Sequence, residues 1–405
     1  MNDRVVSVPV RSRFDARRWT TLLLFNALLF LGVEILLQLG LGELILPAKP
    51  PSGTLARGLE PSALTHHDYV PSARFTTRLS ERDTGTGATN EINSVGIRGP
   101  ELKPKSVYRV LNLGDSFLQA DEIAFADTFG EKLNSYFSTS IEFITHGISG
   151  WAPTPCFSWI YHKGLQLEPD EVNLFLYEND FHRGEVQSMV DANYRRQATY
   201  EGKVPVRYRP EKSEETLLRR AKDLLLKVEL VRLVNSLRNL RLRIGPSTVK
   251  KKIAVVEEML LLDREASEWP PDLRTNVDET LAVVRDARDF LGAREIETNV
   301  FFIPTGLSWE DEVVAGKTRP IYGWDADFSV TQTGLRSYIK KTFTGWAIPY
   351  VDLHAYLDSG KKAAPEKLLY FEEDGHWNEE GHSVVFGILR DLYDARGPMS
   401  ASKPR

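Results

Sequence analysis

The stretch Val107–Leu118, VYRVLNLGDSFL, decides the fold of this chain. It begins with an apolar run of strand-forming residues and breaks at Gly114-Asp115-Ser116, which predicts a buried strand ending in a tight turn. Ligands of open α/β sheets bind in the crevice outside the carboxyl ends of the strands, so a serine in this turn is placed for chemistry. The other interpretation is that Ser116 only caps a short helical turn, a common place for serine.

The composition excludes several classes of protein. With 405 residues the chain is longer than one compact domain usually needs, and its net charge of −5 does not indicate a nucleic-acid partner. The single cysteine, Cys156, excludes an internal disulfide framework and a cysteine-based metal cluster. The histidines show no ligand spacing around the predicted turn, and the pair His66-His67 lies in a predicted linker. We therefore expect neither a metal nor another cofactor.

The N-terminal region predicts a membrane anchor. Residues 1–18 are polar and rich in arginine, and the apolar run Trp19–Leu46 that follows is long enough to span a bilayer. Glu34 within the run weakens this prediction, and a cleaved signal peptide or an amphipathic helix packed on the folded domain would be the alternatives. Because the arginines precede the span, we expect a cytoplasmic N-terminus and a periplasmic or extracellular remainder.

The rest of the chain is predicted to be an α/β domain with an insertion. Strands alternate with helices on both sides of a long charged helical region, which implies a central parallel sheet. The predicted parts are a linker with little regular structure over 47–90, the first part of the domain over 91–183, a helical insertion over 184–292, the second part over 293–397, and a disordered tail over 398–405.

The segment that ends in the last predicted helix could activate the serine. A serine hydroxyl is a weak nucleophile until a base accepts its proton, and the base is usually a histidine held by a carboxylate. His376 lies in a loop before the last predicted helix, and Asp374 lies two residues before it. Glu373 competes with Asp374 as the orienting carboxylate. His382 competes with His376 as the base, but it falls on the helix and not in the loop.

Acyl transfer also needs donors that bind the developing oxyanion. The candidates are the backbone N–H groups of Ser116 and Gly150 and the side-chain amide of Asn179, which follows the third predicted strand. Glycine lets the backbone approach a ligand closely. The alternative for Asn179 is an ordinary turn signal at the end of a strand.

Four blocks of this sequence resemble those of the SGNH (GDSL) hydrolase superfamily. They are GDS at 114–116, HGISGW at 146–151, YENDF at 177–181 and DGHWNEEGH at 374–382. The resemblance runs from about residue 93 to residue 392, interrupted by the insertion, and the lead-in NSVGIRGPE is similar to membrane-tethered bacterial members.

The resemblance implies a fold and a set of roles. The implied fold is a flavodoxin-like three-layer α/β/α sandwich with a central parallel sheet. The implied nucleophile is Ser116, with Gly150 and Asn179 as oxyanion donors and with Asp374 and His376 as the acid–base pair.

The sequence departs from the superfamily pattern twice. Tyr177 stands where a glycine is usual, two residues before the block-three asparagine, and would narrow the pocket beside Asn179. The acid and base are spaced D-x-H instead of D-x-x-H. The shorter spacing resembles the alginate-acetylation branch, whose members are O-acetyltransferases on exported polysaccharide, although there the pair precedes the serine.

These observations predict a membrane-anchored serine esterase that forms an acyl-enzyme on Ser116. The expected substrate carries O-acyl groups on an extracytoplasmic glycan or on a lipid-linked molecule. One alternative is an O-acetyltransferase that uses the same triad and a membrane acyl-donor protein as its partner. A second alternative is a non-catalytic glycan-binding or assembly protein. For the enzyme, Ser116 Oγ should lie within about 3.5 Å of a His376 ring nitrogen.

Overall fold

The computed structural model describes residues 58–77, 87–182, 196–210, 260–306, 332–363, 367–371 and 375–397. All of these belong to one compact unit. The predicted cytoplasmic tail, the predicted span Trp19–Leu46 and the predicted tail 398–405 lie outside the described residues. No helix in the described part of the chain has both the length and the hydropathy needed to cross a membrane.

A five-stranded parallel sheet forms the centre of the unit, as the sequence predicts. Its strand order is β11-β10-β7-β5-β6. In chain order this is 2-1-3-4-5, which is the flavodoxin-like arrangement, and its topological switch lies between β5 and β7. The strands are β5 (Tyr108–Gly114), β6 (Ile141–Gly147), β7 (Glu171–Tyr177), β10 (Glu297–Ile303) and β11 (Tyr350–Asp352).

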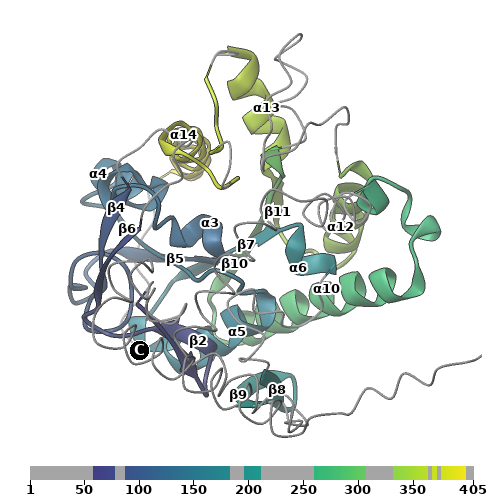
Figure 1. The fold of residues 1–405 in the computed structure, drawn as a ribbon, viewed down its shortest axis with the longest axis horizontal. Helices are drawn as coiled ribbons and strands as arrows, with labels where there is room; N and C mark the ends of the chain where they lie inside the picture. Colours follow the sequence, from purple (N-terminus) through teal and green to yellow (C-terminus); the bar gives the residue numbers. More distant parts are fainter. Residues whose placement is uncertain are drawn as a thin grey trace, which may run out of the picture. The chain divides into compact units, whose positions relative to one another are not determined.

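Helices cover both faces of the sheet, which gives the predicted three layers (Figure 1). Successive side chains of a strand point to opposite faces. On β7, Leu174 and Leu176 belong to one core cluster, and Phe175 and Tyr177 belong to the other. The first cluster includes residues of α5 (Pro153–His162), α10 (Pro271–Gly292) and α12 (Thr333–Gly345). The second includes residues of α4 (Phe129–Tyr136), α13 (Leu353–Ala363) and α14 (Glu379–Arg396).

The predicted linker over 47–90 is wrong for its described part. Two antiparallel hairpins form there, β1 (Leu59–Ser62) with β2 (His66–Tyr69) and β3 (Arg74–Thr77) with β4 (Ala88–Glu91). All four residues of β2 are buried, and apolar side chains of the hairpins pack in the first core cluster. Strands of four residues are too short to show an alternating pattern, so the surrounding Pro, Ser, Thr and Gly dominated the prediction.

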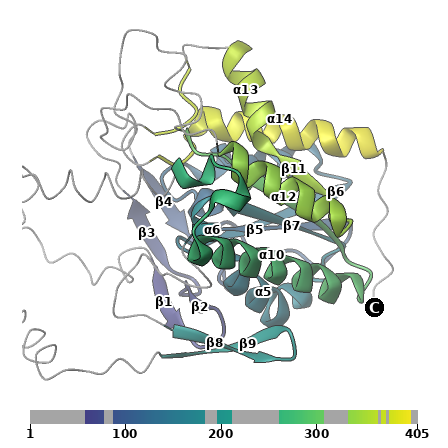
Figure 2. The ribbon, with the colours of Figure 1, turned by 90° about the vertical axis from the view of Figure 1, so that its right-hand side faces the viewer.

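The predicted helical insertion over 184–292 is partly wrong in its described part: the predicted helix over 275–293 is present, but a hairpin precedes it and the helix is not inserted. A hairpin of β8 (Arg196–Glu201) and β9 (Val204–Pro210) lies beside α5 and the β1–β2 hairpin (Figure 2). Helix α10 packs its apolar face on the sheet and directly precedes β10 in the chain, so it belongs to the α/β domain. The sequence prediction assigns α10 to the insertion because the helix carries many charged residues on its outer face. The predicted helices within 211–259 lie outside the described residues.

A buried carboxylate fixes the amino end of the sheet. Glu171 is fully buried, and its two oxygens accept hydrogen bonds from the Asn299 amide at 2.6 Å, the Tyr393 hydroxyl at 2.6 Å, Arg396 Nη1 at 2.9 Å and the Tyr108 hydroxyl at 3.2 Å. The donors come from β10, β5 and α14. This network therefore joins the sheet to the last helix through a charge that would be costly to bury without partners.

Replacing Glu171 by Gln should lower the free energy of unfolding by about 2–4 kcal/mol, because an amide NH₂ would face groups that are themselves donors. The matched control is Glu380→Gln, which makes the same chemical change in an exposed ion pair with Lys367 at 2.9 Å. That change should cost less than about 1 kcal/mol. Urea unfolding monitored by circular dichroism measures both, and equal costs would contradict the role given to Glu171.

Candidate active site

The turn after β5 presents Ser116 at the carboxyl edge of the sheet. Helix α3 (Ser116–Gln119) begins there, and its N-cap is Asp115, whose side chain accepts a hydrogen bond from the Phe117 N–H at 3.0 Å. Ser116 therefore is not the cap, which excludes the structural alternative considered for this residue. The turn also lies tight against β6, because a Cβ on Gly147 would fall 2.4 Å from the carbonyl oxygen of Asp115.

The predicted contact between the serine and the tail histidine is present. His376 Nε2 and Ser116 Oγ lie 2.7 Å apart, within the expected distance, although the two residues are 260 positions apart in the chain. The carbonyl of His376 accepts a hydrogen bond from the Phe371 N–H at 2.8 Å, and its ring packs edge-on against Phe117 at 5.0 Å. The imidazole is thus held by backbone and by packing. With Nε2 as acceptor, the pair can pass a proton from the hydroxyl to the ring.

The orienting carboxylate lies outside the described residues. Glu373 and Asp374 both fall in the segment 372–374, which the structure leaves undescribed, so the choice between them stays a prediction. The next residue, Gly375, has a φ of +80° and donates its N–H to the carbonyl of Phe371 at 3.0 Å.

The three predicted oxyanion donors follow three neighbouring strands. Gly114 of β5 pairs with Gly147 of β6, and Leu113 pairs with Leu174 of β7, so the three strands end at one edge. Ser116 follows β5, Gly150 follows β6 with a φ of +81°, and Asn179 opens helix α6 (Asn179–His182) after β7. The topology brings these residues to the same edge, beside the switch point. Their role as donors stays a prediction.

Tyr177, the residue that departs from the expected glycine, packs against helix α3, which Ser116 begins. It is only 6% exposed, and its ring packs against Phe117 with 4.7 Å between the centroids. Its backbone N–H is bound by the carboxylate of Asp180 at 2.9 Å. The tyrosine therefore supports Phe117, the residue that in turn contacts the His376 ring.

His382, the competing base, is a buried structural residue. Its Nδ1 accepts a hydrogen bond from the Phe129 N–H at 3.3 Å, and its ring stacks on the Phe129 ring. Burial, followed by the nearby charges of Arg98 and Lys132, lowers the pKa of His382 to about 3. A ring that stays neutral and already accepts a backbone hydrogen bond is not placed to take the proton of Ser116, so His376 is the better base.

Two polar residues of the site were not singled out in the sequence. Gln119 accepts a hydrogen bond from the Ser149 N–H at 2.5 Å and thereby ties α3 to the loop that carries Gly150. Arg98 donates to the carbonyls of Ala120 and Ile123, each at 2.6 Å, behind the same helix. The available signals were the position of Gln119 one turn after the serine and the presence of Arg98 in the lead-in NSVGIRGPE. Among the described residues there is no group of three or more His, Cys, Asp or Glu side chains arranged to hold a metal ion.

Comparisons with known proteins add a fold-level likeness. No family model matches the sequence, and no curated protein matches it. Similar solved structures include a member of the lipolytic protein G-D-S-L family from Veillonella parvula (10% identity, 71% of this chain and 99% of that chain, TM-score 0.35). They also include the acetyl xylan esterase AlAXEase (14%, 70% and 98%, TM-score 0.35) and a GDSL-like lipase from Bacteroides thetaiotaomicron (12%, 73% and 93%, TM-score 0.34). Likenesses at such low identity and TM-score assign neither activity nor substrate, so the site is argued from this chain's own geometry.

Substituting His382 by Asn should make the protein less sensitive to acid, because the Asn oxygen can replace Nδ1 as acceptor and does not titrate. The pKa of His382 is about 3 in the folded protein against an ordinary value of 6.5, so the unfolded chain binds the extra proton between these values. His382 therefore costs the folded state nothing above pH 6.5, and it lowers the free energy of unfolding progressively as the pH falls toward 3. Between about pH 6 and pH 4 the variant should lose about 2–3 kcal/mol less than the parent. Urea unfolding at several pH values measures this, and parallel profiles would exclude it.

Proposed function

We propose that this chain is a serine esterase that acts through an acyl-enzyme on Ser116. The observation that carries the proposal is the 2.7 Å contact between Ser116 Oγ and His376 Nε2 at the carboxyl edge of the sheet. The position supports it as well, because the contact lies beside the topological switch between β5 and β7, where open α/β sheets bind their ligands.

The proposed reaction uses His376 to carry the proton and one set of hydrogen-bond donors to bind the oxyanion. His376 Nε2 accepts the hydroxyl proton as Ser116 Oγ attacks the acyl carbonyl, and the carbonyl oxygen becomes an oxyanion bound by the N–H groups of Ser116 and Gly150 and the Asn179 amide. The C–O bond to the leaving alcohol then breaks, and the imidazolium returns its proton to that alcohol oxygen. Water attacks the acyl-enzyme by the same route and releases the acid.

We further propose an O-acylated glycan or a lipid-linked ester as the substrate, and a location at the outer face of a membrane. The support is the apolar run Trp19–Leu46 with arginines before it, which would hold the domain beside surface polymers or lipids. The D-x-H spacing of Asp374 and His376 favours a second candidate, an O-acetyltransferase. In that case a membrane donor protein supplies the acyl group, and the enzyme transfers it to a sugar hydroxyl. The two candidates differ in the molecule that donates the acyl group and in the acceptor, water or a sugar hydroxyl, that reaches the acyl-enzyme.

The Ser116→Ala and His376→Gln variants should each lower kcat on p-nitrophenyl acetate by about 10³-fold or more, because the acyl-enzyme can no longer form at a useful rate. A fluorophosphonate should add one phosphonyl group to the parent and none to Ser116→Ala, as measured by intact mass.

Acetate release from an acetylated oligosaccharide, with and without a non-acetylated acceptor, separates hydrolysis from transfer. Equal turnover by the parent and Ser116→Ala would refute the proposal, and absence of activity in both would favour a binding protein.

The Asp374→Asn variant should lower kcat by about 10²- to 10⁴-fold, because the His376 imidazole would lose the group that holds its tautomer. Glu373→Gln, the matched control at the neighbouring carboxylate, should stay within about threefold of the parent. Steady-state kinetics on the same ester measures both variants. The reverse pattern would assign the orienting role to Glu373.

A further inference from the structure

Side chains hold the backbone on both sides of Ser149, the residue before Gly150. The Ser149 N–H donates to Gln119 Oε1 at 2.5 Å, and the Ser149 carbonyl accepts from His67 Nε2 at 2.9 Å. The Ser149 carbonyl and the Gly150 N–H belong to one planar trans peptide, so they point in opposite directions. A hydrogen bond that fixes this carbonyl therefore fixes the direction of the Gly150 N–H.

From this geometry we propose that His67 is a positioning residue for the oxyanion donor Gly150. The inference rests on the proposed esterase function, in which the Gly150 N–H binds the oxyanion. Gly150 has a φ of +81°, and glycine adopts several backbone conformations at little cost, so the peptide before it can rotate and aim the N–H elsewhere. The hydrogen bond from His67 opposes that rotation.

The tautomer of His67 is set by its neighbour. Donation from Nε2 to a carbonyl requires a proton on Nε2, which in a neutral ring leaves Nδ1 as an acceptor. His67 Nδ1 lies 2.7 Å from His66 Nδ1, so His66 supplies the complementary donor. His66 is fully buried and adopts a φ of +70°, a conformation that few side chains take. The adjacent histidine pair, placed in a linker by the sequence prediction, thus forms a chain of two hydrogen bonds that ends at the Ser149 carbonyl.

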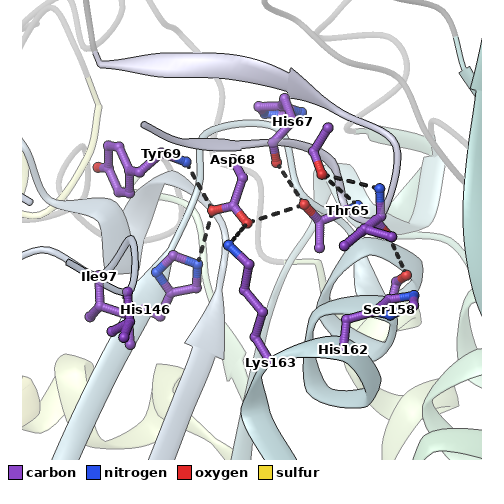
Figure 3. Close-up of polar contacts among 12 residues, drawn as sticks. Thr65, His67, Asp68, Tyr69, Ile97, His146, Ser158, His162 and Lys163 are labelled. Carbon is purple, nitrogen blue, oxygen red and sulfur yellow. Dashed lines mark hydrogen bonds and ion pairs between the residues drawn. The ribbon is translucent and has the colours of Figure 1, made fainter. Parts of the chain in front are cut away.

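The strand that carries His67 is anchored by an ion pair whose carboxylate is buried. Asp68, the next residue of β2, accepts from Lys163 Nζ at 2.9 Å, from the Tyr69 N–H at 2.8 Å and from Thr65 Oγ1 at 3.2 Å, as Figure 3 shows. These bonds tie β2 to the end of α5 and to its own turn. A side chain can hold a neighbouring peptide in place only if its own backbone is held, and this pair provides that support.

Two aromatic contacts complete the anchor. The indole N–H of Trp151 donates to the carbonyl of His67 at 3.0 Å, so the residue after Gly150 is bound to the strand as well. His146 Nε2 lies 3.8 Å from Asp68 Oδ1, and Figure 3 shows the His146 ring facing this carboxylate. Burial lowers the pKa of His146 to about 3, so its ring is neutral and stacks on Trp159, and Lys163 supplies the charge that pairs with Asp68.

The test compares two substitutions of His67 with opposite expected results. His67→Leu removes the donor and should lower kcat on p-nitrophenyl acetate by about 10- to 100-fold with KM within about twofold, because the oxyanion exists only in the transition state. His67→Gln places an amide N–H near the position of Nε2 and should stay within about threefold of the parent. A residue that only stabilised the fold would not separate kcat from KM or be rescued by Gln.

The matched control is Ser158→Ala in helix α5. Ser158 Oγ donates to the Leu64 carbonyl at 2.5 Å, so this variant weakens the packing of the same hairpin and leaves the Ser149 peptide untouched. It should lower the melting temperature and keep kcat within about twofold of the parent. If His67→Leu does not fold, Gln119→Met removes the other bond to Ser149 and should lower kcat in the same way.

Outcomes for the positioning role and for the esterase function are separable. Should Ser116→Ala keep the parent's turnover, the esterase proposal fails and the positioning role fails with it. If turnover depends on Ser116 but folded His67→Leu keeps the parent's kcat, or if His67→Gln is as impaired as His67→Leu, only the positioning role fails. Hydrogen–deuterium exchange of a peptide covering 147–151 adds a measurement without turnover. Exchange there should rise in His67→Leu and match the parent in His67→Gln.

Discussion

The parallel pairing of β5 with β6 and β7 is the constraint on which the site depends. It brings three turns to one edge, and it does so at close range because Gly114 pairs with Gly147, where a Cβ on Gly147 would collide with the nucleophile turn. An order in which β6 or β7 did not neighbour β5 would move its turn at least one further strand spacing from Ser116. The serine, the glycine loop and the asparagine turn therefore share an edge as a consequence of strand order, before any of their own contacts are considered.

The N-terminal hairpins extend this constraint from the sheet to the loops. Arg98 binds the carbonyls behind α3, and His67 binds the carbonyl of Ser149, so a segment that precedes the sheet holds two of its loops. The ion pair of the buried Asp68 with Lys163 fixes that segment to α5. Removing Lys163 would leave the buried Asp68 carboxylate without its cation, which is costly, so the pair resists displacement of this segment.

The sequence predicts the layers of this fold well, but it does not predict the side-chain hydrogen bonds that hold its loops. Alternating apolar residues such as Leu174 and Phe175 are visible in one strand, and four short blocks suffice to predict that Ser116 and His376 meet. The roles of His67 and Gln119 depend on contacts with Ser149, and the His67 contact joins residues 82 positions apart that no local pattern connects. The hairpins were missed for the related reason that their order comes from tertiary packing.

Tyr177, which stands where the resemblance leads one to expect a glycine, packs against the ring that supports His376. Phe117 contacts the His376 ring at 5.0 Å, the Trp377 ring at 5.0 Å and the Tyr177 ring at 4.7 Å. A glycine at position 177 would leave the far side of Phe117 without this packing, and voids in a core let side chains move. Tyr177 fills that space. It thereby restricts the movement of Phe117 and of the His376 imidazole that packs against Phe117. The departure therefore changes which group supports the base and leaves the contact between the base and the serine intact.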